Sequence, residues 1–128
     1  MTTPPKKILI ADDEPNIVIS LEFLLQREGY AVSVARDGQQ ALDAIAREAP
    51  DLVLLDVMMP LKTGFEVCAS VRADPALAHT RILMLSAKGR DTDLAKGMAL
   101  GADAYMTKPF ATRELVTKVA DMLAQERP

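Results

Sequence analysis

Short runs of consecutive apolar residues alternate along this chain with longer segments in which apolar residues recur every three or four positions. Continuous apolar runs of four to six residues are typical of strands buried on both faces of a parallel sheet. They predict strands over residues 7–11, 31–35, 52–55, 81–85 and 104–107. The three-to-four spacing is typical of helices with one buried face, and it predicts helices over 15–28, 39–48, 65–72, 91–100 and 112–125.

Residues at the predicted helix ends support these boundaries. Pro15 suits the first helical position, which makes Glu14 the expected N-cap. Gly29 and Gly101 follow the helices that end at 28 and 100, where glycine commonly terminates a helix. The alternation of strands and helices therefore continues from one end of the chain to the other.

Five β–α units in succession predict an α/β fold with a doubly wound parallel sheet. Right-handed crossovers would place helices on both faces of the sheet. Rossmann-type and flavodoxin-like strand orders both fit this pattern, and a five-stranded sheet favours the flavodoxin-like order 2-1-3-4-5. In that order the first and third strands are neighbours at the centre of the sheet.

Length and composition limit the alternatives. With 128 residues and 13.9 kDa, the chain is expected to form a single domain over 1–128, with a core from about 6 to 124 and short flexible ends. A net charge of −3 argues against general affinity for nucleic acid or anionic membranes. Cys68 is the one cysteine, so no internal disulfide can form. Neither a signal peptide nor a run long enough to span a membrane is evident, and we expect a cytoplasmic protein.

Polar residues follow four of the predicted strands. Asp12 and Asp13 follow the first, Asp56 the third, Ser86 the fourth and Lys108 the fifth. Ligands of open parallel sheets bind at the carboxyl ends of the strands, so these side chains should converge. Each residue alone is weak evidence, because an acidic pair often favours a helix start and a loop serine or lysine is usually solvated.

Three carboxylates held together at the end of a buried sheet require a counter-charge. A single lysine cannot neutralise them, whereas Mg²⁺ accepts oxygen ligands and keeps several waters. We expect an ion pair between Asp56 and Lys108 in the resting state and a magnesium site beside it. A carboxylate oxygen can also accept a phosphoryl group, with Lys108 and Ser86 positioned to bind two of the phosphoryl oxygens.

The residues around these positions resemble the receiver domain of bacterial two-component response regulators. The resemblance extends from about Lys6 to Leu123. Four motifs in order carry it: Ile8-Leu9-Ile10-Ala11-Asp12-Asp13-Glu14, Asp56-Val57-Met58-Met59-Pro60, Ser86-Ala87-Lys88 and Gly101-Ala102-Asp103-Ala104-Tyr105-Met106-Thr107-Lys108-Pro109-Phe110.

The resemblance implies that Asp56 accepts a phosphoryl group from a sensor histidine kinase or a phosphotransfer protein. It implies a Mg²⁺ ion, replaceable by Mn²⁺, held by Asp56, directly by Asp13, through water by Asp12 and by the backbone carbonyl of Met58. Such a domain catalyses only its own phosphorylation and dephosphorylation and is not an enzyme acting on an outside substrate.

The resemblance also assigns switch residues. Ser86 and Lys108 would bind the phosphoryl oxygens, and movement of Ser86 toward the phosphate would let Tyr105 rotate inward. The signal would then appear on the face formed by 91–100, 104–107 and 112–125. In similar domains the Lys108–Pro109 peptide bond is cis.

One departure from the family pattern and one pair of residues beside the site bear on function. Residues 61–64 are Leu-Lys-Thr-Gly, with threonine in place of the acidic residue that usually precedes this glycine. Met58 and Lys88 each lie two residues after a site residue, Asp56 and Ser86 respectively. Neither side chain offers a base for water, so we expect a long-lived phosphorylated state.

Other functions remain open at this point. The chain could be a receiver fold that binds proteins without being phosphorylated, or the receiver piece of a larger DNA-binding regulator whose recognition helix lies elsewhere. A flavin or nucleotide binder is disfavoured, because Asp12 and Asp13 would repel a bare phosphate. An aspartate-nucleophile phosphatase would usually have a second aspartate at the position of Met58. The sequence names neither the kinase nor the downstream target, and homodimerisation on phosphorylation stays open.

Overall fold

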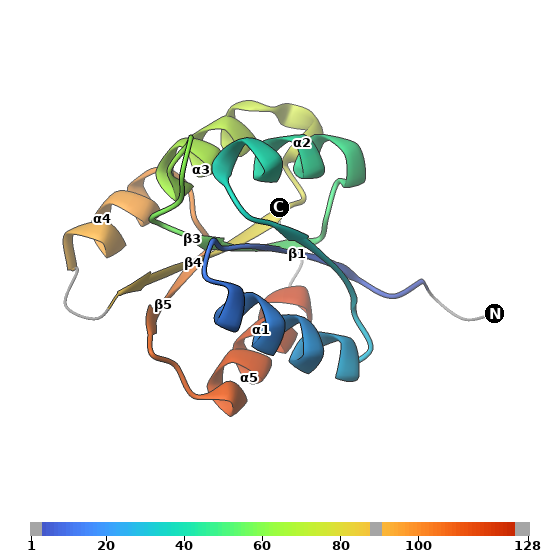
Figure 1. Cartoon of the computed structure of the whole chain (residues 1–128). Coiled ribbons are helices and arrows are strands. Elements are labelled where there is room, and N and C mark those ends of the chain that lie inside the picture. The colour runs from blue at the N-terminus through green and yellow to red at the C-terminus, as the bar shows by residue number, and fades with distance from the viewer. Residues whose placement is uncertain (1–3, 88–90, 125–128) are drawn as a thin grey trace.

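The fold is a five-stranded parallel sheet covered by helices on both faces (Figure 1). The computed structural model describes residues 4–87 and 91–124. Its elements are β1 (Lys7–Ala11), α1 (Pro15–Arg27), β2 (Ala31–Ala35), α2 (Gly38–Glu48), β3 (Leu52–Asp56), α3 (Gly64–Ala73), a 3₁₀ turn (Pro75–Leu77), β4 (Arg81–Ala87), α4 (Asp91–Ala99), β5 (Ala104–Lys108) and α5 (Thr112–Ala124).

The strand order is β2-β1-β3-β4-β5, and every pair is parallel. This confirms the predicted flavodoxin-like order. Helices α1 and α5 cover one face of the sheet, and α2, α3 and α4 cover the other (Figure 1). Because β1 and β3 are neighbours at the centre, the loops that follow them lie side by side at the carboxyl edge of the sheet.

Alternate residues of the central strands build two separate layers of core. Ile8 and Ile10 of β1 pack with α1 and α5, whereas Leu9 and Ala11 pack with α2 and α3. Residues 52–55 of β3 are likewise fully buried on both sides. Burial on both faces explains why these strands read as continuous apolar runs instead of alternating ones.

The observed elements differ from the predicted ones mainly at their ends. Strands β3, β4 and β5 extend one or two residues further than expected and include Asp56, Ser86 and Lys108. The cause is ladder pairing, because Asp56 pairs with Leu85 and Ser86 pairs with Thr107. These polar residues therefore have strand geometry, which fixes the direction of each side chain.

Helix boundaries show smaller shifts. Helix α1 ends at Arg27 and α4 at Ala99, one residue earlier than predicted, while α2 begins at Gly38 and α3 spans 64–73. The 3₁₀ turn at Pro75–Leu77 was not predicted, and its N-cap Asp74 accepts a hydrogen bond from the backbone of Ala76. Within residues 4–87 and 91–124, no helix combines the length and the apolar character that crossing a membrane requires.

Candidate functional site

Three carboxylates meet at the carboxyl edge of the sheet, as the sequence predicted. Asp12 and Asp13 lie at the end of β1, and Asp56 is the last residue of β3. Each offers an oxygen atom within 4.8 Å of the others. Asp12 is 0% exposed and Asp56 6% exposed, whereas Asp13 lies at the surface. Carboxylate oxygens at this spacing suit a hard divalent cation such as Mg²⁺.

Lys108, at the end of β5, places its ammonium group between these acids. Its Nζ lies 2.8 Å from Oδ2 of Asp12, 3.4 Å from Oδ1 of Asp56 and 3.4 Å from Oε1 of Glu14. The predicted contact with Asp56 is present, but the shortest one is to Asp12. Lys108 sits closest to the fully buried carboxylate, whose need for a counter-charge is the greatest.

Burial and charge set the acidity of these groups. Burial, followed by the negative charge of Asp12, raises the pKa of Asp56 from 3.8 to about 6, although Lys108 acts in the opposite direction. Burial alone would lower the pKa of Lys108, but its hydrogen bond to Asp12 and the charges of Asp56, Asp12 and Glu14 raise it above its ordinary value. Lys108 thus stays charged, while Asp56 is a carboxylate with unusual affinity for a positive partner.

Backbone contacts hold Asp12 in place at the start of α1. Its N–H donates to the carbonyl of Ala35, and its Oδ1 accepts a hydrogen bond of 2.9 Å from the N–H of Glu14. Glu14 is the N-cap of α1, as predicted, but its side chain makes no capping bond. With Pro15 at the first helical position, the Glu14 carboxylate turns instead toward Lys108.

The loop between β3 and α3 passes very close to Asp56. The N–H of Gly64 donates to the carbonyl of Val57, and a Cβ atom at Gly64 would lie 2.3 Å from the carbonyl oxygen of Asp56. Only glycine fits there. Thr63, which departs from the family pattern, forms a capping box with Glu66 at the start of α3, so the substitution has a structural explanation.

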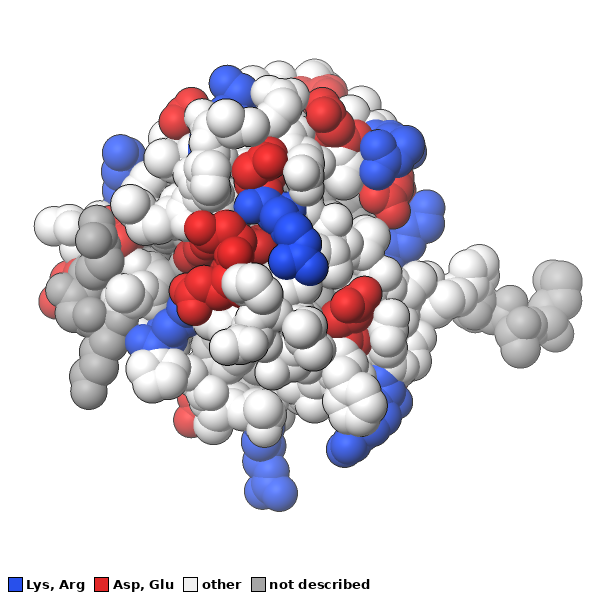
Figure 2. Space-filling view, in the orientation of Figure 1, with Lys and Arg blue, Asp and Glu red and all other residues white. Residues whose placement is uncertain are grey.

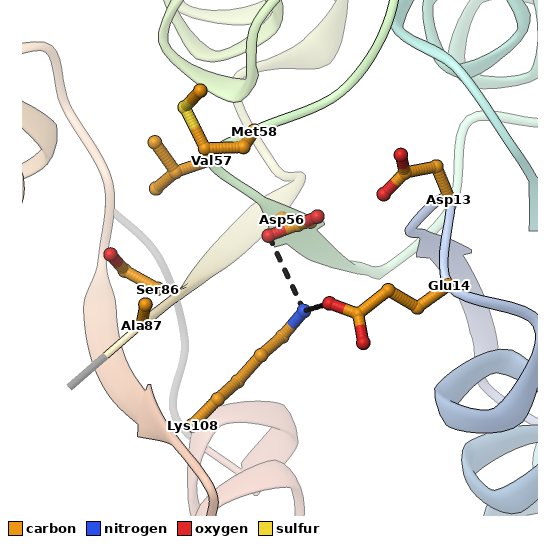
Figure 3. Close-up of a pocket in the computed structure, with 8 residues that line it drawn as sticks. All are labelled: Asp13, Glu14, Asp56, Val57, Met58, Ser86, Ala87 and Lys108. Atoms are coloured by element: carbon orange, nitrogen blue, oxygen red, sulfur yellow. Dashed lines mark hydrogen bonds and ion pairs between the residues drawn. The ribbon is translucent and has the colours of Figure 1, made fainter.

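Ser86 lies on the opposite side of Asp56 from Asp13 (Figure 3). Its hydroxyl group donates a hydrogen bond of 2.9 Å to Oδ2 of Asp93, in the first turn of α4. Sequence reasoning missed Asp93. An acidic residue in the first turn of a helix usually indicates only a favourable interaction with the helix dipole. Asp93 differs from such residues because it is buried.

These residues border an open cleft of about 320 Å³. It is lined by Asp13, Glu14, Asp56, Val57, Met58, Ser86, Ala87 and Lys108 (Figure 3). Figure 2 shows acidic side chains gathered on the surface near the β1–α1 loop, with a basic side chain beside them. A small anion can enter this acidic surface only together with a cation.

The remaining predicted residues are placed as follows. Met58 lines the cleft and is 60% exposed. Tyr105 is half-buried beside Met84 of β4, against the core layer formed with α2 and α3. The Lys108–Pro109 bond is cis, as the resemblance implied. Lys88 lies outside the described residues.

The sequence model of the response regulator receiver domain matches residues 8–120. A protein designated a response regulator in Chloroflexus aurantiacus is 37% identical, with a TM-score of 0.90 over 94% of this chain and 99% of that one. Chemotaxis protein CheY4 of Vibrio cholerae is 33% identical, with a TM-score of 0.86 over 92% and 98%.

A further similar structure bears on the cation. The receiver domain of a sensor histidine kinase from Pseudomonas aeruginosa, which has a magnesium ion coordinated in its active-site cleft, is 26% identical to this chain. Its TM-score is 0.87, over 94% of this chain and 99% of that one.

Proposed function

This chain belongs to the response regulator receiver family, and on that premise we propose that it is a phosphorylation switch that works in the cytoplasm. Asp56 accepts a phosphoryl group from a phosphohistidine of a sensor kinase or phosphotransfer protein. The observation that carries the proposal is the position of Asp56. It is 6% exposed, ends a central strand, and has two further carboxylates and an ammonium group around it.

The transfer is a substitution at phosphorus. An oxygen atom of Asp56 forms a bond to phosphorus while the bond between phosphorus and the imidazole nitrogen of the donor breaks. The leaving nitrogen keeps the electron pair. Catalysis of such a step consists mostly of positioning and of stabilising charge on the transferred oxygens.

The surrounding residues supply that stabilisation. Lys108 lies close enough to Asp56 for its ammonium group to contact one phosphoryl oxygen, and the hydroxyl group of Ser86 is available to a second after it rotates. Asp12, Asp13, Asp56 and the backbone carbonyl of Met58 are the residues that we propose hold the cation. When bound, Mg²⁺, or Mn²⁺ in its place, neutralises negative charge on the remaining phosphoryl oxygen.

The output surface that we propose is formed by α4, β5 and α5. Tyr105 of β5 is half-buried there, and two large apolar side chains of α4 are partly exposed, Leu94 at 41% and Met98 at 45%. Displacement of Ser86 toward the phosphoryl group would leave room for Tyr105 to move inward. A downstream protein, or a second copy of the chain, would bind to the altered surface.

Intact mass spectrometry tests the proposal directly. The protein is incubated with acetyl phosphate and Mg²⁺, and a single phosphoryl adduct is expected. The adduct should be absent from Asp56→Asn and from a sample treated with EDTA. Asp121→Asn, which removes an exposed carboxylate of α5, is the matched control and should be phosphorylated normally.

Failure of the wild type to gain the adduct with any small phosphodonor would overturn the proposal. In that case the fold would act as an unphosphorylated protein-binding scaffold. An adduct that persists in Asp56→Asn would show instead that another residue is the acceptor.

A further inference from the structure

The hydrogen bond between Ser86 and Asp93 joins the phosphorylation site to α4. Ser86 lies near the end of β4, and Asp93 lies seven residues later in the first turn of α4. The donor and acceptor atoms are 2.9 Å apart. Ser86 is 2% exposed and Asp93 5% exposed, so both groups depend on protein partners instead of bulk water.

A serine hydroxyl group carries one proton and can donate one hydrogen bond at a time. The resting structure directs that proton to Asp93. A phosphoryl oxygen on Asp56 would need the same proton. The hydrogen bond from Ser86 to Asp93 must therefore break before Ser86 can donate to the phosphoryl group. A buried carboxylate that loses a hydrogen-bond donor is destabilised.

Helix α4 buries few of its side chains. Among its residues, only Asp93 and Gly97 are buried, while Leu94 and Met98 are partly exposed. Helices with few buried apolar contacts belong to the least stable parts of a fold. Loss of the Ser86–Asp93 bond should therefore loosen the first turn of α4.

We propose that Asp93 is a positioning residue that holds the Ser86 hydroxyl group in the resting arrangement and so sets the balance between the resting and activated states. The inference rests on the proposed function and adds to it a specific resting-state partner. Phosphorylation would compete with Asp93 for Ser86, and the competition would transmit the event to α4.

Beryllofluoride, a phosphoryl mimic that binds without a covalent donor, provides the test. Its affinity is measured with Mg²⁺ for the wild type, Asp93→Ala, Asp93→Asn and Asp91→Ala. Asp93→Ala removes the competing acceptor and should bind about tenfold more tightly, the effect of one charge-assisted hydrogen bond. Asp93→Asn keeps an acceptor oxygen and should stay within about twofold of the wild type.

Asp91→Ala is the matched control, because Asp91 lies in the same helical turn but is exposed; it should behave as the wild type. The same substitutions are then combined with Ser86→Ala in double variants. Without the hydroxyl group, Asp93→Ala should change the affinity less than about twofold, because the coupling acts through Ser86. Circular dichroism verifies that each variant is folded.

A second readout does not depend on phosphorylation. Three-bond couplings report the side-chain rotamer of Ser86 in the metal-free protein, and Asp93→Ala should redistribute that rotamer while Asp91→Ala should not. The role of Asp93 would be overturned if Asp93→Ala left the rotamer of Ser86 unchanged or did not increase the affinity for beryllofluoride. It would also be overturned if Asp93→Ala changed that affinity equally with and without Ser86→Ala. Absence of beryllofluoride binding by the wild type, with the rotamer shift present, would overturn the proposed function and leave the resting contact intact.

Discussion

Lys108 illustrates how a single residue can stabilise a site that is rich in negative charge. Its ammonium group is 2.8 Å from Asp12, which is 0% exposed, and 3.4 Å from Asp56. Removing one partner of a buried ion pair leaves the other charge uncompensated, which typically costs several kcal/mol. The same arrangement that suits a phosphoryl oxygen therefore also supports the fold.

Lys108→Met should lower the free energy of unfolding by about 3 kcal/mol in EDTA at neutral pH. Added Mg²⁺ should recover part of the loss, because a divalent cation at the carboxylates replaces the missing charge. Urea denaturation measures both effects. Lys6→Met, at an exposed position, is the control and should change the stability by less than about 0.5 kcal/mol. A loss that Mg²⁺ cannot reduce would contradict the electrostatic explanation.

Met58 gives a second prediction at the residue scale. It lines the cleft beside Asp56 and is 60% exposed, and its thioether offers water no strong hydrogen-bond acceptor. Met58→Asn should position a water molecule near the acyl phosphate and speed hydrolysis about tenfold. The decay of the phosphoryl adduct, followed by intact mass, measures the rate.

The control for Met58 is Leu61→Asn in the same loop. Leu61 is 76% exposed and has a φ angle of 70°, a conformation that asparagine tolerates well. Because Leu61 does not line the cleft, this variant should keep the slow hydrolysis of the wild type. Rapid hydrolysis by the wild type itself would contradict the expected long lifetime of the phosphorylated state.

At the scale of elements, the β3–α3 loop decides where Asp56 lies. Gly64→Ala would place a Cβ atom 2.3 Å from the backbone oxygen of Asp56, so the loop must move. We expect a loss of about 2–3 kcal/mol in stability and weaker Mg²⁺ binding. Thr63→Ala breaks the capping box and should cost about 1 kcal/mol without changing Mg²⁺ affinity. Equal Mg²⁺ affinities for both variants would show that the loop does not position the site.

The elements also show how far a sequence determines its fold. Buried strands and amphipathic helices have strong periodicity, and the first and third strands were correctly predicted as neighbours. The strand ends were predicted too short, because Asp56 and Ser86 look like loop residues and join the ladder only through pairing with Leu85 and Thr107. Local pattern carries no information about such cross-strand partners.

The candidate site was predicted better than its internal contacts. Convergence of Asp12, Asp13, Asp56 and Lys108 followed from topology, since the carboxyl ends of parallel strands share one edge. The preference of Lys108 for Asp12 depends on relative burial, which only the folded structure reveals. The contact between Ser86 and Asp93 depends in the same way on how the first turn of α4 packs against β4.

At the scale of the whole molecule, the raised pKa of Asp56 makes the stability of the fold depend on pH. The folded pKa of Asp56 is about 6, against an ordinary value of 3.8. Folding therefore favours the protonated form, and the metal-free protein should lose stability as the pH rises from about 4 to above 6. Each pKa unit corresponds to about 1.4 kcal/mol, so the loss from this group is at most about 3 kcal/mol.

Comparison with Asp56→Asn isolates this contribution, because all other titrating groups are shared. In EDTA the variant and the wild type should have similar stability near pH 4, and the variant should be more stable by about 2–3 kcal/mol at pH 7.5. Urea denaturation at several pH values measures the difference. Mg²⁺ at a hundred times its dissociation constant should bring the two stabilities together at pH 7.5, since it adds about 2.7 kcal/mol to the wild type that binds it. A difference between the two proteins that does not change with pH would show that the ionisation of Asp56 is not coupled to folding.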